Sequence, residues 1–166
     1  MRIVLFWLFI IGLQVVLLNH LDLSAYLIPQ VFILLLIKLP LNINKMYQVL
    51  IAFGLGLLMD MFTSTPGIHA SACLWLIIIR IGLLSGQDLK EHEANKATFS
   101  ANTAGLAPFM YTTIILVFFY HLYIFWLESI GALNWSLWLT TFIVSSISAL
   151  TVMGIIEYLS FTNYDE

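Results

Sequence analysis

The amino-acid sequence predicts an all-α membrane protein, a compact bundle of six transmembrane helices forming one integral membrane domain over residues 1–166. Of the 166 residues, 61% are hydrophobic and only 9% are charged, and the mean hydropathy is +1.00. Soluble domains carry roughly a quarter of charged residues, so this chain lacks the polar surface that a water-soluble globule needs. Several apolar runs also approach or exceed the roughly 17–25 residues that cross a bilayer as a helix.

The apolar runs are expected to be helices, because a helix satisfies its own backbone N–H and C=O groups in lipid. They are too uniformly apolar for the strands of a membrane barrel, in which lipid-facing and lumen-facing residues alternate. The first run follows Arg2 but no cleavage site follows it, which indicates an uncleaved first helix rather than a signal peptide. The helices are expected at about 3–18, 26–41, 47–62, 67–84, 107–127 and 137–159.

The connection from Ser85 to Leu106 is the longest and most polar of the chain. Asp88 and Glu91 have the spacing of a capping box, which favours a short helix at the membrane surface over about 89–98. A solvated irregular loop is the competing interpretation. The sequence alone does not decide between them.

The basic residues predict the orientation of the bundle. All six Lys and Arg residues fall on one side of the six-helix arrangement, and the connections on the other side contain none. Cytoplasmic connections carry the excess of Lys and Arg, so both termini are expected in the cytoplasm. The six residues are Arg2, Lys38, Lys45, Arg80, Lys90 and Lys96.

Three charged residues lie inside apolar runs, near the ends predicted to be cytoplasmic. Long basic side chains at such depths can extend to the interface, and we favour this interpretation for Lys38 and Arg80 over an internal ion pair. Glu157 is interpreted in the same way. Aromatic residues collect around the opposite ends of the last two helices, as in an interfacial aromatic belt: Tyr120, Tyr123, Trp126, Trp135 and Trp138.

The sequence contains none of the common catalytic, nucleotide-binding or metal-binding motifs, and no basic patch for nucleic acid. We therefore expect no enzymatic activity, no cofactor and no metal site. His121, inside the fifth run, is interpreted as a hydrogen-bonded packing residue, and Cys73 as a small buried residue without a disulfide partner. The chain is expected to work by binding within the membrane.

Two helices carry small residues that permit close approach of another helix. On the third helix these are Ala52, Gly54 and Gly56. On the sixth they are Thr141, Ser145, Ser148 and Ala149. Packing within the bundle is favoured over an interface with a partner protein.

Asp60 ends an otherwise apolar run, just before a short turn into the fourth helix. Thr65 and Pro66 are predicted to be the N-cap and the first residue of that helix. The free N–H groups of the helix start could then receive the Asp60 carboxylate, and His69 is a second candidate partner. A latch between the third and fourth helices is favoured, while a role in binding a partner stays open.

The same stretch contains a spaced pattern made by Gly56, Leu57, Leu58, Asp60, Phe62, Pro66 and Gly67. This pattern resembles the signature hairpin of the rod shape-determining protein MreD family. Chain length, helix count and the predicted position of the termini are also similar to that family, so the resemblance covers nearly the whole chain. The sequence departs from the common form because glycine follows the proline directly.

The resemblance implies a non-enzymatic scaffold of the bacterial cell-elongation complex in the cytoplasmic (inner) membrane. Members bind the transmembrane anchor of MreC, and together they link MreB indirectly to peptidoglycan synthesis by RodA and its transpeptidase partner. Membrane lipid is a further expected contact, and a homodimer stays open. The implied fold is similar to the substrate-binding components of energy-coupling-factor transporters.

The main alternative is therefore a vitamin-binding component of such a transporter. Those proteins resemble one another in an Ala-x-x-x-Ala face on the first helix, whereas the first helix here has Gly12 as its small residue. An outward vitamin pocket would also need polar groups. Those available near the predicted outer side are Gln14, Asn19, His20, Asp60 and His69. An intramembrane enzyme is a third and less favoured class.

Overall fold

The computed structural model describes residues 2–18, 29–87, 97–129 and 135–162. The secondary-structure elements in these ranges are all helices, and none is a β-strand. Two helices follow one another directly at the start of the chain, and a short helix precedes the long ones. In chain order the elements are α1 (Arg2–Gly12), the π-helix η1 (Leu13–Leu18), α2 (Ile33–Ile37), α3 (Lys45–Thr63), α4 (Ile68–Ser85), α6 (Ala101–Ala104), α7 (Leu106–Glu128) and α8 (Trp135–Thr162).

Four of these helices are long and apolar enough to cross a membrane, namely α3, α4, α7 and α8 over 135–159. The chain is thus a multi-pass membrane protein. α1 and η1 cover the first predicted helix, and the prediction of a helix at about 89–98 lies almost wholly outside the described residues. The predicted count of six spans is therefore not confirmed by the described residues, among which four helices are long and apolar enough to span a membrane.

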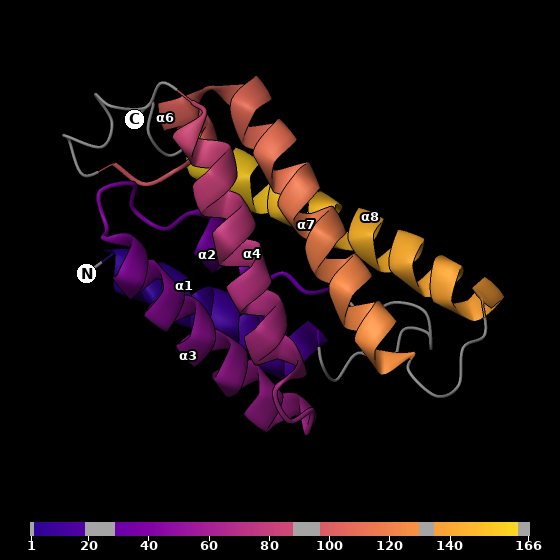
Figure 1. The fold of residues 1–166 in the computed structure, drawn as a ribbon. Coiled ribbons are helices and arrows are strands. Elements are labelled where there is room, and N and C mark those ends of the chain that lie inside the picture. Colours follow the sequence, from indigo (N-terminus) through magenta and orange to yellow (C-terminus); the bar gives the residue numbers. More distant parts are fainter. Residues whose placement is uncertain (1, 19–28, 88–96, 130–134, 163–166) are drawn as a thin grey trace.

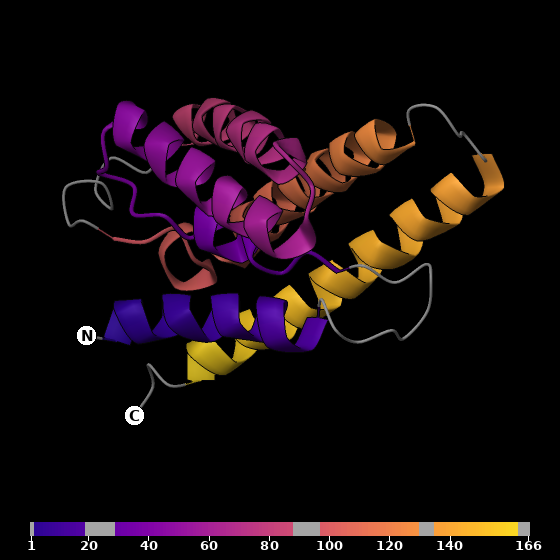
Figure 2. The same ribbon diagram turned by 90° about the horizontal axis from the view of Figure 1, so that it is seen from below.

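The long helices form two layers with α2 between them. Figure 2 shows α3, α4 and α7 in one layer and α1 in the other, with α8 running obliquely from beside α1 at its end to the level of α7 at its start. Within the second layer α4 lies between α3 and α7 and contacts both (Figure 1). The start of α1 and the end of α8 lie at the same end of the molecule in both views.

The predicted helix over 26–41 is wrong for the part of that range that the structure describes. Only Ile33–Ile37 form a helix, and residues 31–37 are fully buried, with no exposed surface. Interrupted backbone of this kind is tolerated at membrane depth only inside protein, because lipid offers no hydrogen-bond partners. An apolar run enclosed by other helices and one facing lipid have the same composition, so the sequence could not separate them.

A glutamine side chain holds the start of this buried segment. Oε1 of Gln14 accepts hydrogen bonds from the backbone N–H groups of Val31 (2.8 Å) and Phe32 (3.3 Å). Nε2 of Gln14 donates to the carbonyl oxygen of Pro29 at 3.2 Å. Gln14 is itself buried within η1. One amide side chain thus satisfies three backbone groups that the short helix leaves unpaired.

Arg80 holds the other end of the segment. Its guanidinium donates to the carbonyl oxygens of Ile37 (Nε, 3.1 Å) and Leu39 (Nη2, 2.6 Å), and to Oε1 of Gln48 (Nη1, 2.8 Å). Arg80 is only 1% exposed, so the prediction that it extends to the membrane interface is wrong. The planar fork of a guanidinium suits this task, because it presents several donors in fixed directions.

Replacing Arg80 with leucine is expected to destabilise the protein. The change leaves three buried acceptors without their donor, and each loss costs about 1–3 kcal/mol, offset in part by removal of a buried charge. We expect the free energy of unfolding in detergent to fall by about 2–4 kcal/mol. Lys45→Leu, at an exposed position, is the control and should change it by less than about 0.5 kcal/mol. Equal stability of both variants would contradict the role of Arg80.

Candidate functional site

The turn between α3 and α4 spans residues 64–67. α3 ends at Thr63, and its C-cap residue Ser64 adopts a left-handed conformation with φ of 56° and donates its N–H to the carbonyl oxygen of Asp60. Gly67 precedes α4 with φ of 85°, a conformation that L-residues with a side chain rarely adopt. A glycine at position 67 is therefore a requirement of this turn.

The Asp60 carboxylate binds the start of α4 from the preceding helix. Oδ1 accepts from the backbone N–H of His69 (2.9 Å) and the hydroxyl of Thr65 (3.0 Å), and Oδ2 accepts from the N–H of Ala70 (3.0 Å). His69 and Ala70 are the second and third residues of α4, whose own N-cap residue is a glycine without a side-chain acceptor. Asp60 thus satisfies the N–H groups that an N-cap side chain would normally bind. This is the geometry of a hairpin latch, and a partner-binding role for Asp60 stays a prediction.

The predicted capping role of Thr65 and Pro66 is wrong. The helix begins two residues later than expected, at Ile68, and Pro66 is an exposed residue of the turn. Thr65 uses its hydroxyl to support Asp60 instead of the helix start. Because a carboxylate from α3 supplies the cap, the turn can extend past the proline.

Close contact between α3 and α4 depends on Gly56. A Cβ atom added there would lie 2.4 Å from Cα of Ala70 and 2.7 Å from the carbonyl oxygen of His69. Neither backbone atom can move without separating the helices. Ala52 is also buried, but Gly54 is exposed and has open space around it, so its predicted packing role within the bundle is wrong.

His69 connects the hairpin to the centre of the molecule. Its Nδ1 lies 2.9 Å from the hydroxyl of Tyr120 on α7, and both side chains are buried. The ring of Phe32, at the start of α2, meets both rings edge to face, with centroids 6.2 and 6.0 Å away. The His69 side chain therefore pairs with Tyr120, and the prediction that Tyr120 belongs to an interfacial belt is wrong.

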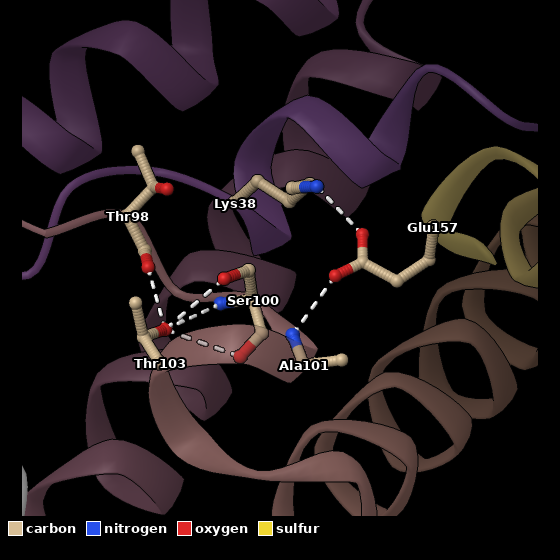
Figure 3. A network of polar contacts seen from close by, with 6 residues as sticks. All are labelled: Lys38, Thr98, Ser100, Ala101, Thr103 and Glu157. Atoms are coloured by element: carbon tan, nitrogen blue, oxygen red, sulfur yellow. Dashed lines mark hydrogen bonds and ion pairs between the residues drawn. The ribbon is translucent and has the colours of Figure 1, made fainter. Parts of the chain in front are cut away.

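A second polar cluster lies at the end of α8 (Figure 3). Nζ of Lys38 is 2.6 Å from Oε2 of Glu157, and Oε1 of Glu157 accepts from the N–H of Ala101 at 2.8 Å. The two charged side chains are 14% and 10% exposed. The internal ion pair, which the sequence analysis ranked below interfacial exposure, is thus the arrangement found for Lys38 and Glu157.

Beside this ion pair, a capping box forms the start of α6. The backbone N–H of Ser100 donates to Oγ1 of Thr103 at 3.0 Å, and that hydroxyl donates to the carbonyl oxygen of Thr98 at 2.8 Å. Glu157 therefore ties α8 both to the buried segment after α2 and to the ordered turn before α7.

The small residues predicted on the last helix lie where α8 packs. Ser145 and Ala149 are fully buried, Thr141 is 9% exposed and Ser148 is half-buried. α8 contacts α7 and α6. Among the described residues no group of three or more His, Cys, Asp or Glu side chains could hold a metal ion. Asn19 and His20 lie outside the described residues.

Comparison with protein-family models, with curated proteins and with solved structures found no match to this chain.

The sequence analysis singled out most of the polar side chains that matter, but it did not predict which groups they bind. Gln14 was noted only as a group for an outward pocket, yet an amide in the middle of an apolar helix indicates a buried acceptor or donor nearby. Nothing in the sequence distinguishes Tyr120 and Gln48 as buried, hydrogen-bonded residues, because tyrosine and glutamine are common near membrane interfaces.

Gly56 and Gly54 offer a matched test of the helix contact. Gly56→Ala forces a Cβ into the backbone of α4 and should lower the free energy of unfolding by about 1–3 kcal/mol. Gly54→Ala, two residues away on the same helix with open space, should raise it by about 0.5–1 kcal/mol, because alanine is the better helix former. Thermal unfolding in detergent measures both. A stabilising Gly56→Ala would show that the helices are not in contact there.

Asp60→Asn should weaken the latch. The amide keeps one acceptor oxygen, but its NH₂ group faces a backbone N–H donor and the negative charge at the helix start is lost. We expect stability to fall by about 1–3 kcal/mol. Glu128→Gln, which removes an exposed carboxylate at the same end of the molecule, should change it by less than about 0.5 kcal/mol. The latch is excluded if both changes have the same small effect.

Proposed function

We propose that this protein is a non-enzymatic membrane scaffold of the bacterial cell-elongation complex, of the MreD kind, and that it binds the transmembrane anchor of MreC in the inner membrane. Through MreC it links MreB filaments to RodA and its transpeptidase partner. The observation that carries the proposal is the α3–α4 hairpin. Three residues of the MreD-like pattern each meet a separate geometric requirement of that hairpin.

Gly56 is required by the close approach of α3 and α4, Asp60 caps α4, and Gly67 adopts a positive φ. These three residues therefore serve to form the hairpin, and none of them presents a reactive group to a substrate. Such a pattern suits a protein whose task is to hold a rigid surface in the membrane. This supports a scaffold over an intramembrane enzyme, whose polar groups would converge on an open pathway.

The vitamin-binding alternative receives less support from the same geometry. Gln14, Asp60 and His69 are buried, and each is hydrogen-bonded to another part of the chain. Polar groups engaged in this way cannot orient a vitamin without first breaking the bundle. Gly12, the small residue of the first helix, has open space around it but no second small residue to extend the face.

Co-purification tests the proposal. The protein, expressed with an epitope tag and with MreC from the same source, should retain MreC after extraction in mild detergent and should not retain an unrelated single-span membrane protein. Gly56→Ala should reduce the retained MreC, because a displaced α4 alters the hairpin surface. Gly54→Leu places a side chain on the exposed face of α3 and tests whether MreC lies there.

Depletion in a rod-shaped bacterium is the cellular counterpart. Cells that lose the protein should become round, and expression of the wild-type chain should restore rods. Unchanged shape after depletion, together with tight binding of a vitamin by the isolated protein, would overturn the scaffold and establish the transport component.

A further inference from the structure

An apolar groove lies where α4, α7 and α8 meet. It has a volume of about 470 Å³. Its walls are four aromatic rings from α7 and α8, one from α4, and two aliphatic side chains. The lining residues are Trp75, Ile79, Phe119, Leu122, Tyr123, Trp126 and Trp138.

The groove opens on the surface that faces lipid. Trp75, Phe119 and Trp126 line it and are nevertheless 54%, 45% and 54% exposed. All three belong to helices long and apolar enough to cross a membrane, so in a bilayer the exposed parts of their rings would contact lipid. The groove is therefore continuous with the lipid-covered surface of the protein, and whatever covers that surface also has access to the groove.

One wall of the groove is fixed by ring stacking within α8. Trp138 lies parallel to Phe142, with centroids 5.7 Å apart and an interplanar angle of 10°. Phe142 in turn meets Phe118 of α7 edge to face at 5.2 Å. These contacts hold α8 beside α7, so this wall of the groove is fixed by packing within the protein.

The residues that line the groove favour a flexible chain over a helix as its occupant. Interfaces between membrane helices are enriched in Gly, Ala, Ser and Thr, which let the backbones approach closely. None of these residues lines the groove, and no charged group does. A volume of about 470 Å³ is in the range of sites that enclose a small ligand.

We propose that the groove binds one acyl chain of a phospholipid from the leaflet next to the start of α8. By the distribution of Lys and Arg this is the outer leaflet. The chain fills the space between α4, α7 and α8, and the amphipathic Trp and Tyr rings at its mouth lie at the depth of the lipid headgroups. This inference does not depend on the scaffold proposal, because it concerns the isolated protein and lipid alone.

A matched pair of variants on α4 tests the site. Ile79 lines the groove, whereas its neighbour Ile78 is 55% exposed and does not. The protein is purified in mild detergent with added phosphatidylethanolamine and examined by native mass spectrometry. Wild type and Ile78→Trp should retain one lipid, and Ile79→Trp should show at least about fivefold lower occupancy, because the larger ring takes the place of the acyl chain. Equal occupancy in the two variants would overturn the proposal.

Labelling of the unmodified protein guards against misfolding of a variant. A phosphatidylethanolamine with a diazirine near the middle of one acyl chain is placed in vesicles with wild-type protein and illuminated. Labels should concentrate on the peptides that contain Leu122 and Trp138, above the level on the exposed face of α3 at Leu50 and Phe53. Uniform labelling of all the membrane-spanning helices, with no excess on the groove peptides, would overturn the site.

Discussion

The pairing of backbone groups in residues 29–41 is the constraint on which the arrangement of the other helices depends. This stretch is interrupted helix inside an apolar interior, where an unpaired N–H or C=O group is costly. Gln14 binds its start from η1 and Arg80 binds its end from α4. Because the two side chains reach the segment from different helices, η1 and α4, the segment fixes the positions of those helices relative to one another. α3 joins the same arrangement through Gln48, whose Oε1 accepts a hydrogen bond from the Arg80 guanidinium.

Several ionisable side chains in the described interior have structural roles. Ionisable residues inside membrane segments are by default candidates for transport or catalysis. Here Asp60 caps a helix, while Lys38 and Glu157 tie α8 to the centre. A buried charge that lost its partner would destabilise the bundle strongly. Rigidity of this kind suits the proposed scaffold, which would present fixed surfaces to neighbouring membrane proteins.

How much the sequence could predict depended on the distance over which each interaction acts. Membrane character and the approximate bounds of α3, α4, α7 and α8 follow from local composition and were predictable. The contact between Asp60 and the start of α4 is also local, and was expected within one turn. The ion pair between Lys38 and Glu157 joins residues 119 apart in sequence, and nothing in either neighbourhood indicates the other. The break near Ile33 was hidden because Ile33–Ile37 are as apolar as a lipid-facing helix.

The central claim is that the segment around α2 is enclosed by protein and does not face lipid. Methyl-labelled protein in nanodiscs that contain a spin-labelled lipid tests this directly by nuclear magnetic resonance. The methyl groups of Leu34, Leu35 and Leu36 should all show weak paramagnetic relaxation, since all three are fully buried, whereas Leu50 and Leu57, at 53% and 41% exposure, should relax strongly. Strong relaxation at any of the three, as a lipid-facing helix would give, would contradict the account.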